Sequence, residues 1–253
     1  MSSALETAPA TTVGLPERRI RRRRPLLVGE LVVVLCLLRV YDLARAHAEV
    51  RRTAAIAHGE TILRLEGWLH LDIERAVNIW TTRHQELSLL ASHLYQFLHI
   101  PVTLSVLAWC WLLRPELYRR ARNALVLVNI TGLAVFLLLP VAPPRLLPDS
   151  GFVDAVAAAG FGTTHSAGPV DADQYGAMPS LHMAWAVWSA VVAYWLVRRQ
   201  LLKVVWVVYP LLITVIVVMT ANHYLLDLVA GAGVAAAALA TSGLHRVREY
   251  GGS

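Results

Sequence analysis

The sequence predicts an all-α integral membrane protein: a six-transmembrane helix bundle with interfacial amphipathic helices between the first and second spans. Two observations predict this class. Of the 253 residues, 57% are hydrophobic and 16% are charged, whereas a soluble domain averages roughly 45–50% and about 25%. The apolar residues also gather in six runs that approach the length of about 20 residues needed to cross a bilayer as a helix. This composition excludes an ordinary soluble globule and a disordered chain.

The six predicted spans form one membrane domain behind a short tail. The first span follows a run of arginines and has no small-residue cleavage site, so we interpret it as an uncleaved anchor. A five-span alternative leaves this first run lying in the interface. We expect residues 1–24 to be a disordered basic tail and residues 25–248 to form a single six-span domain. The predicted spans are residues 26–43, 87–113, 123–140, 181–197, 204–220 and 224–242.

Basic residues predict the side of the membrane on which each connection lies. Six arginines fall between residues 18 and 24, four between 114 and 122, and three basic residues between 198 and 203. Six spans put all of these on one side, which an excess of Lys and Arg marks as cytoplasmic. We therefore expect a multi-pass protein of the cell membrane with both termini in the cytoplasm. Because the formal charge of +6 follows topology, no nucleic-acid partner is expected.

The connection between the first two spans is amphipathic. From residue 61 to residue 80, apolar side chains recur at helical spacing among charged ones. This pattern predicts interfacial helices, which lie in the plane of the membrane surface. The alternative is a lid that packs on the bundle.

Polar residues gather at the outer ends of three predicted spans, where they are functional candidates because polar groups are costly at membrane depth. Arg145 follows the third span, Ser180 and His182 begin the fourth, and His223 and Asp227 begin the sixth. Between His182 and His223 the chain crosses inward once and outward once, so both residues return to the same face. We expect Arg145, His182 and His223 to converge there, on the extracytoplasmic side.

These residue types suit phosphate chemistry. His223 and Asp227 are four residues apart and share a helix face, so the carboxylate can accept a hydrogen bond from the ring and raise the basicity of its other nitrogen. Ser180 suits a helix cap with free amides nearby to hold an anion. Arg145 supplies a planar, permanently charged fork. Taken singly, each residue also has a structural explanation at a membrane interface.

A polar stripe runs along the second predicted span at spacings of three and four residues. The stripe either makes hydrogen bonds between helices or lines a headgroup pocket. For such a pocket the candidates are Tyr95, His99 and, beside the second histidine, Asn222. The stripe consists of Ser92, Tyr95, Gln96, His99 and Thr103.

Four aspartates lie in the long outer loop between the third and fourth spans. They lack the spacing of metal ligands, and we expect them to be solvated. The sequence predicts no metal site and no cofactor. The aspartates are Asp149, Asp154, Asp171 and Asp173.

Two motifs give the sequence a family resemblance. Pro179-Ser180-x-His182 followed by His223-x-x-x-Asp227 resembles the second and third motifs of the type 2 phosphatidic acid phosphatase superfamily. The resemblance covers roughly residues 87–236. The sequence is similar in particular to the branch that contains fungal inositol phosphorylceramide synthases and their bacterial relatives. The residues that carry this narrower likeness are Met178, Leu181, Asn222 and Tyr224.

The resemblance implies a mechanism as well as a fold. Members of the family are six-helix membrane enzymes that need no metal. By analogy, His223 attacks the phosphorus atom while Asp227 orients and activates it. His182 protonates the leaving oxygen, and Arg145 with Ser180 holds the phosphoryl oxygens.

The chain departs from the commoner phosphatase pattern at two motifs. The usual first motif has a lysine seven residues before an Arg-Pro pair, whereas Leu138 stands there and Leu146 follows Arg145. The usual third motif has Ser-Arg before its histidine, where this chain has Ile216 and Val217. Two phosphate-binding cations are thus missing. Their substitutes are either backbone amides or arginines on the same predicted side, which are Arg51, Arg52, Arg64, Arg75 and Arg83.

We expect an enzyme of lipid metabolism that transfers a phosphoryl or phospho-headgroup unit through a phosphohistidine, similar to inositol phosphorylceramide synthase. The first alternative is a lipid-phosphate phosphatase that hydrolyses phosphatidate or a polyprenyl (di)phosphate. A non-catalytic lipid-binding or transport protein is the alternative from another class. The expected partners are the bilayer and a phospholipid or lipid-phosphate substrate. The headgroup, the acceptor and the oligomeric state are left open by the sequence.

Overall fold

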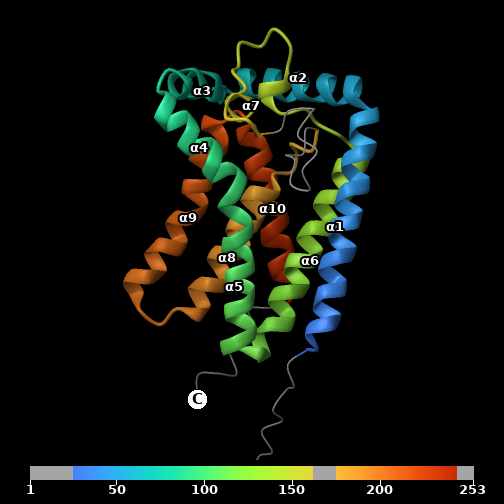
Figure 1. The fold of residues 1–253 in the computed structure, drawn as a ribbon, viewed down its shortest axis with the longest axis vertical. Coiled ribbons are helices and arrows are strands. Elements are labelled where there is room, and N and C mark those ends of the chain that lie inside the picture. The colour runs from blue at the N-terminus through green and yellow to red at the C-terminus, as the bar shows by residue number, and fades with distance from the viewer. Residues whose placement is uncertain (1–24, 162–174, 244–253) are drawn as a thin grey trace, which may run out of the picture.

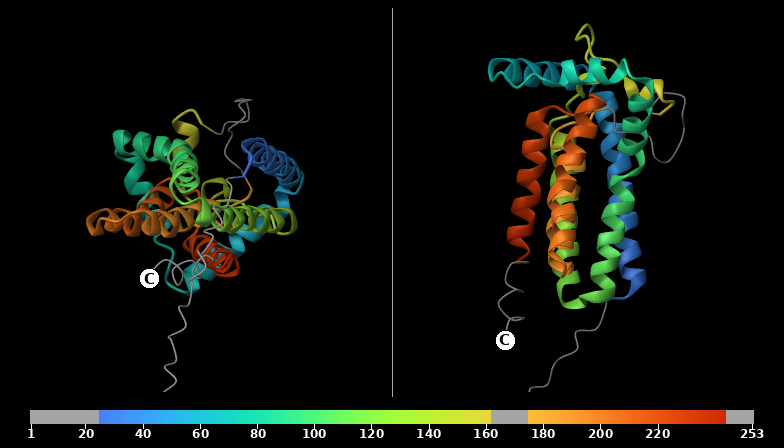
Figure 2. Two further views of the ribbon diagram at one scale, coloured as in Figure 1. Left: turned by 90° about the horizontal axis from the view of Figure 1, so that it is seen from below. Right: turned by 90° about the vertical axis from the view of Figure 1, so that its left-hand side faces the viewer.

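The computed structural model describes residues 25–161 and 175–243, and within these residues it is all-helical apart from one isolated β-bridge between Val141 and Gly176. Long helices run side by side as a bundle, and two helices lie across one end of it (Figures 1 and 2). The all-α prediction is therefore confirmed. The predicted tail 1–24 and the last residues of the predicted domain lie outside the described residues.

Each predicted span coincides with a helix or with a pair of consecutive helices. The second predicted span is a pair, α4 and α5, which meet at a bend of 41°. The bundle helices are α1 (Leu27–Val50), α4 (Gln85–Phe97), α5 (His99–Leu113), α6 (Pro115–Leu138), α8 (Leu181–Leu196), α9 (Gln200–Met219) and α10 (Leu225–Thr241).

The lengths and hydropathies of these helices are compatible with a membrane protein. Within the described residues, α6 and α9 are long and apolar enough to cross a bilayer, and the bent pair α4–α5 makes a third candidate if it acts as one span. Helices α8 and α10 are apolar but shorter, with 16 and 17 residues. The count of six spans stays a prediction.

The core of the bundle lies where α8 packs between α6 and α10. Trp188 on α8 is completely buried, and its indole N–H donates a hydrogen bond to the carbonyl oxygen of Ala121 on α6 at 2.8 Å. Small residues such as Ala184 and Ala235 let the helices approach closely in this cluster. This packing holds α8 against α6 and α10.

Two helices, α2 (Arg52–Trp68) and α3 (Glu74–Thr82), lie across the end of the bundle and are called the lid (residues 52–82). An amphipathic helix normally buries its apolar side chains, but the lid also buries several polar ones. Its buried polar residues include Glu66, Glu74 and Asn78, whereas Trp68 is 76% exposed and Trp80 is 54% exposed. The face that packs on the bundle therefore carries buried polar side chains together with small residues such as Ala55 and Gly59.

The buried polar side chains of the lid bind the ends of bundle helices. Asn78 donates to the carbonyl oxygen of Met219, the last residue of α9, at 3.0 Å. Arg51, just before α2, donates to the carbonyl oxygen of Leu137 near the end of α6 at 3.1 Å. Terminal carbonyls of a helix have no partner within the helix. The lid thus supplies partners that the bundle lacks.

The connection from α6 to α8 runs under the lid and carries two short helices. The first is η1 (Pro144–Leu146), and the second is α7 (Ala155–Ala158). The backbone N–H of Ala142 donates to Ala55 in α2 at 2.9 Å, and the N–H of Val141 donates to Tyr175 at 2.8 Å. The first bond ties the loop to the lid, and the second joins the two ends of the loop to each other.

The contact between α8 and α10 leaves no room for a side chain at Gly231. A Cβ atom there would lie 2.2 Å from the carbonyl oxygen of Ser180, whereas a Cβ at Gly233 on the same helix meets nothing within 4 Å. We therefore expect Gly231→Ala to lower the free energy of unfolding by about 1 to 3 kcal/mol, because the backbones must move apart. Gly233→Ala is the matched control and should be neutral or slightly stabilising. Thermal unfolding in detergent measures both, and equal melting temperatures for the two variants would contradict the close approach.

Candidate active site

Arg145 lies in η1 and is bound on three sides. Its backbone N–H donates to the carbonyl oxygen of Ala221 at 3.0 Å, and its Nε donates to Oδ1 of Asn222 at 2.8 Å. Its Nη1 donates to Oδ2 of Asp154 at 2.6 Å. The side chain is buried, and its Nη2 has no hydrogen-bond partner among the described residues. Arg145 thus stands beside the residues that precede His223, with N–H donors left to bind an anion.

Asp154 is a correction to the sequence analysis, which expected a solvated aspartate. Its Oδ1 accepts the backbone N–H of Ala157 at 2.9 Å and so caps α7, while Oδ2 pairs with Arg145. The side chain is 24% exposed. Asp149 is exposed as expected, and Asp171 and Asp173 lie outside the described residues. The spacing of nine residues between Arg145 and Asp154 in a loop carries no pattern that could have predicted this pair.

His223 is held in one tautomer by its surroundings. Its Nδ1 lies 2.9 Å from the carbonyl oxygen of Ala177 and 3.5 Å from Oδ2 of Asp227. A carbonyl oxygen only accepts hydrogen bonds, so in the neutral ring Nδ1 carries the proton and Nε2 presents a lone pair. The predicted contact between His223 and Asp227 is present, but the shared helix face is not, because His223 lies before the start of α10. The Ala177 carbonyl is a second partner that the sequence did not reveal.

The two histidines face each other directly. Nδ1 of His182 lies 3.2 Å from Nε2 of His223. Since Nε2 of His223 is the acceptor, His182 Nδ1 is the donor of this hydrogen bond. The structure therefore brings together two residues that are 41 positions apart in the chain, as the counting of spans predicted.

Tyr95 and His99 pack against His182. The ring of Tyr95 stacks on it with centroids 4.6 Å apart, and the ring of His99 meets it edge-on at 4.1 Å. His99 Nδ1 lies 3.0 Å from the carbonyl oxygen of Tyr95. Two of the three residues predicted for a headgroup pocket thus lie beside a candidate catalytic histidine. The third, Asn222, is buried and binds Arg145 through its amide oxygen.

Ser180 links the second motif to the third. Its hydroxyl oxygen accepts the backbone N–H of Met183 at 3.3 Å, so Ser180 caps α8 as the sequence predicts. Its backbone N–H donates to the carbonyl oxygen of Asp227 at 3.0 Å. The start of α8, with His182, is therefore tied to the first turn of α10, with Asp227.

A family model places the chain among known proteins. The model of the PAP2 superfamily matches residues 60–241, which is most of the chain and includes all the candidate residues described above. The chain belongs to the PAP2 superfamily. Members of this superfamily are typically phosphatases or phosphotransferases that act on lipid phosphates. The comparisons with curated proteins and with solved structures gave no match.

PAP2 membership confirms the resemblance at the level of the superfamily. The narrower likeness to inositol phosphorylceramide synthases remains a prediction. The roles of the individual residues likewise rest on the resemblance and on the geometry.

Three of the arginines considered as substitutes for the missing PAP2 cations contact other groups. Arg51 donates to carbonyls at the end of α6, Arg64 donates to Thr61 at the surface, and Arg75 donates to the carbonyl oxygen of Ser150. Arg52 and Arg83 are exposed. Among these arginines and Arg145, all within the described part of the chain, only Arg145 is bound to a residue next to His223, through Asn222.

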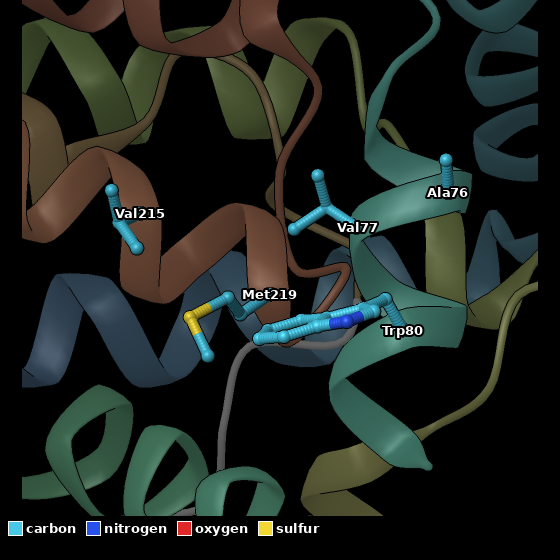
Figure 3. Close-up of a pocket in the computed structure, with 5 residues that line it drawn as sticks. All are labelled: Ala76, Val77, Trp80, Val215 and Met219. Carbon is cyan, nitrogen blue, oxygen red and sulfur yellow. The ribbon is translucent and has the colours of Figure 1, made fainter. Parts of the chain in front are cut away.

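An apolar pocket of about 410 Å³ lies between α3 and α9, away from these residues (Figure 3). It is lined by Ala76, Val77, Trp80, Val215 and Met219. The lining offers no charged group that could hold a phosphate. None of the candidate residues described above lines this pocket.

The contact between Asp154 and Arg145 predicts a selective effect on phosphate-ester turnover. Asp154→Asn keeps the cap of α7 but removes the charge that holds the guanidinium, so we expect kcat/KM to fall about tenfold. The matched control is Asp149→Asn, because Asp149 is exposed in the same loop. Steady-state assays in detergent measure both variants. Wild-type kcat/KM in Asp154→Asn would show that the ion pair does not position Arg145.

Proposed function

We propose that the protein is a membrane enzyme that transfers a phosphoryl or phospho-headgroup unit from a lipid phosphate through a phosphohistidine at His223. The observation that carries this proposal is the contact between Nδ1 of His182 and Nε2 of His223 at 3.2 Å, beside an arginine with an unpaired N–H group. A nucleophilic nitrogen that carries no proton, a proton donor within reach and a fixed cation are the groups that phosphoryl transfer requires.

The first step forms one bond to phosphorus and breaks another. The lone pair on His223 Nε2 attacks the phosphorus atom, and the bond from phosphorus to the leaving oxygen breaks. The electron pair of that bond stays on the leaving oxygen, which takes the proton from His182. Asp227 and the Ala177 carbonyl oxygen stabilise the Nδ1–H of His223 as the ring becomes positively charged.

The second step reverses these roles. An acceptor hydroxyl group gives its proton to His182 while its oxygen attacks the phosphorus of the phosphohistidine, and the bond from phosphorus to Nε2 breaks. Throughout both steps Arg145 neutralises charge on the phosphoryl oxygens through Nη2, which is buried and therefore interacts strongly. Ser180, at the amide-rich start of α8, is proposed as a further contact for these oxygens.

The acceptor distinguishes two versions of this function. The motif context of Met178, Leu181 and Tyr224 favours transfer to a lipid or polyol hydroxyl, as in inositol phosphorylceramide synthases. The absence of the commoner phosphatase cations at positions 138 and 217 also favours a specialised enzyme. Hydrolysis by water, as in a lipid-phosphate phosphatase, is the second candidate because many PAP2 proteins are phosphatases.

The arrangement of the helices supports the proposed topology. The start of α1 and the end of α10 lie at the end of the bundle opposite the lid (Figure 2), as an even number of crossings requires. Exposed Trp68 and Trp80 on the lid suit the level of the lipid headgroups, where Trp is favoured. We propose six spans, cytoplasmic termini, and a lid and active site at the extracytoplasmic face.

Purified protein in nanodiscs tests the two histidines and the acceptor together. With a phospholipid donor we expect turnover that depends on an added alcohol or polyol acceptor. His223→Ala should abolish turnover, and His182→Ala should lower kcat about 100-fold or more, because it removes the proton donor. Free phosphate released at the same rate without acceptor would identify a phosphatase. Turnover that survives both substitutions, or no turnover with any lipid phosphate, would refute the phosphohistidine mechanism.

The two histidine roles also predict a pH dependence. His223 must be unprotonated to attack, whereas His182 must carry a proton to donate, so the plot of kcat/KM against pH should be bell-shaped. Initial rates over the pH range in which the protein stays folded provide the measurement. A rate that rises steadily into alkaline pH would contradict acid catalysis by a histidine.

A further inference from the structure

Carboxyl groups occupy the amides at the start of α10, directly after His223. The backbone N–H of Tyr224 donates to Oδ2 of Asp227 at 3.0 Å, which is a contact within α10 itself. The next two amides bind the lid: Leu225 donates to Oε1 of Glu74 at 2.9 Å, and Leu226 donates to Oε1 of Glu66 at 2.7 Å. The first amides of a helix have no partner within the helix, so these three acceptors determine how α10 begins.

The two glutamates are completely buried, in contrast to the usual position of acidic side chains on an amphipathic helix. Glu66 and Glu74 have no solvent exposure, and neither does Asp227. Each of the three carboxyl groups has one oxygen without a hydrogen-bond partner among the described residues. Burying like charges together is costly, so at least one member of such a cluster holds a proton.

The protonation state of Glu66 follows from this burial. Burial raises the pKa of Glu66 from its ordinary 4.5 to about 9, and the neighbouring carboxyl groups of Glu74 and Asp227 raise it further, while the Leu226 amide acts in the opposite direction. The titratable groups that face Glu66 are Glu74 from α3, and Asp227 and Tyr224 from the start of α10. Burial among other carboxyl groups therefore favours the neutral form of Glu66.

The lid also packs closely against the residue that follows His223. A Cβ atom at Gly59 in α2 would lie 2.8 Å from the hydroxyl oxygen of Tyr224 and 2.6 Å from the carbonyl oxygen of Ala142. The same hydroxyl donates to that carbonyl oxygen at 2.9 Å. Helix α2 thus approaches Tyr224 without an intervening side chain, so the lid and the start of α10 form one packed unit.

We propose that Glu66 and Glu74 are positioning residues for the transfer reaction, and that they hold the start of α10 so that His223 Nε2 faces His182. This inference rests on the proposed function. His223 lies outside the regular turns of α10, so its position depends on where the helix begins. Oδ2 of Asp227 contacts both the Tyr224 amide and the His223 ring. A rotation of the first turn would therefore move the nucleophile and its carboxylate together.

Two substitutions at Glu66 distinguish the effect of side-chain length from the effect of an ionisable carboxyl group. Glu66→Gln keeps the length of the side chain and an oxygen that can accept the Leu226 N–H, but it cannot ionise. Glu66→Asp keeps the acid but is one methylene shorter, so it cannot reach the amide without a shift of the backbone. If the residue positions α10, kcat should fall about tenfold or more in Glu66→Asp with KM changed less than about threefold, and Glu66→Gln should stay close to wild type.

The matched control is Glu60→Gln. Glu60 lies on the same helix as Glu66, but it is exposed and contacts Arg64 at the surface. We expect wild-type kinetics for this variant. The same pair of substitutions at Glu74 should follow the order expected at Glu66. Retained activity in both Asp variants, or a loss in the Gln variants equal to that in the Asp variants, would overturn the proposal.

Hydrogen exchange provides a readout that does not depend on turnover. The amide of Leu226 should exchange faster in Glu66→Asp than in wild type and Glu66→Gln, because its acceptor, the Glu66 carboxyl group, has been withdrawn. If the wild type has no transferase activity but this order of exchange rates is found, the proposed function fails and the capping of α10 stands. Unchanged exchange in Glu66→Asp would overturn the capping itself.

The raised pKa of Glu66 predicts a third difference, in stability. Between pH 4.5 and about 9 the folded protein keeps a proton on Glu66 that the unfolded chain releases. The stability that this proton contributes to the folded state is therefore complete below pH 4.5, the ordinary pKa. It is lost as pH rises through the folded-state pKa of about 9. The melting temperature of Glu66→Gln should fall less than that of wild type over this range. Identical pH dependence in the two proteins would contradict a buried, proton-holding Glu66.

Discussion

The ends of the bundle helices carry backbone N–H and C=O groups that have no hydrogen-bond partner within the helix. Buried polar side chains of the lid bind some of these groups. Asn78 binds the last carbonyl of α9, and Glu66 and Glu74 bind the first amides of α10. An unpaired backbone group is expensive where water is excluded. This requirement explains why Glu66, Glu74 and Asn78 of the lid are buried against the bundle.

The candidate active site depends on this arrangement because its residues stand at the same helix ends. His182 lies in the first turn of α8, His223 lies just before α10, and Arg145 lies in the loop that the lid covers. The bond from the Ser180 amide to the Asp227 carbonyl ties the two histidine motifs to each other. Ala142, in the loop that carries Arg145, connects that loop to both the lid and α10. Its carbonyl oxygen accepts the hydroxyl group of Tyr224, and its N–H donates to α2. Three motifs that are distant in sequence thus form one packed unit.

Local sequence was enough to predict the part of the site that obeys helical spacing and the order of spans. The four-residue separation predicted that His223 and Asp227 meet, although His223 lies before the first turn of α10, and the order of the predicted spans placed His182 and His223 at one end of the bundle. The pair of Arg145 with Asp154 was not predictable, because it depends on the path of an irregular loop. Glu66 and Glu74 were also missed: on an amphipathic helix an acidic residue is normally solvated, and only the tertiary position of the lid shows that their side is buried.

The central claim is that His223 carries the phosphoryl group between donor and acceptor. The most direct measurement is to mix the enzyme with a phospholipid donor in the absence of acceptor, quench at alkaline pH, where phosphohistidine survives, and locate the phosphate by mass spectrometry of peptides. The account predicts a phosphorylated peptide containing His223, modified on that ring, and its disappearance when an acceptor alcohol is added before the quench. Turnover with the phosphate on a different residue, or with no covalent intermediate under any quench, would contradict it.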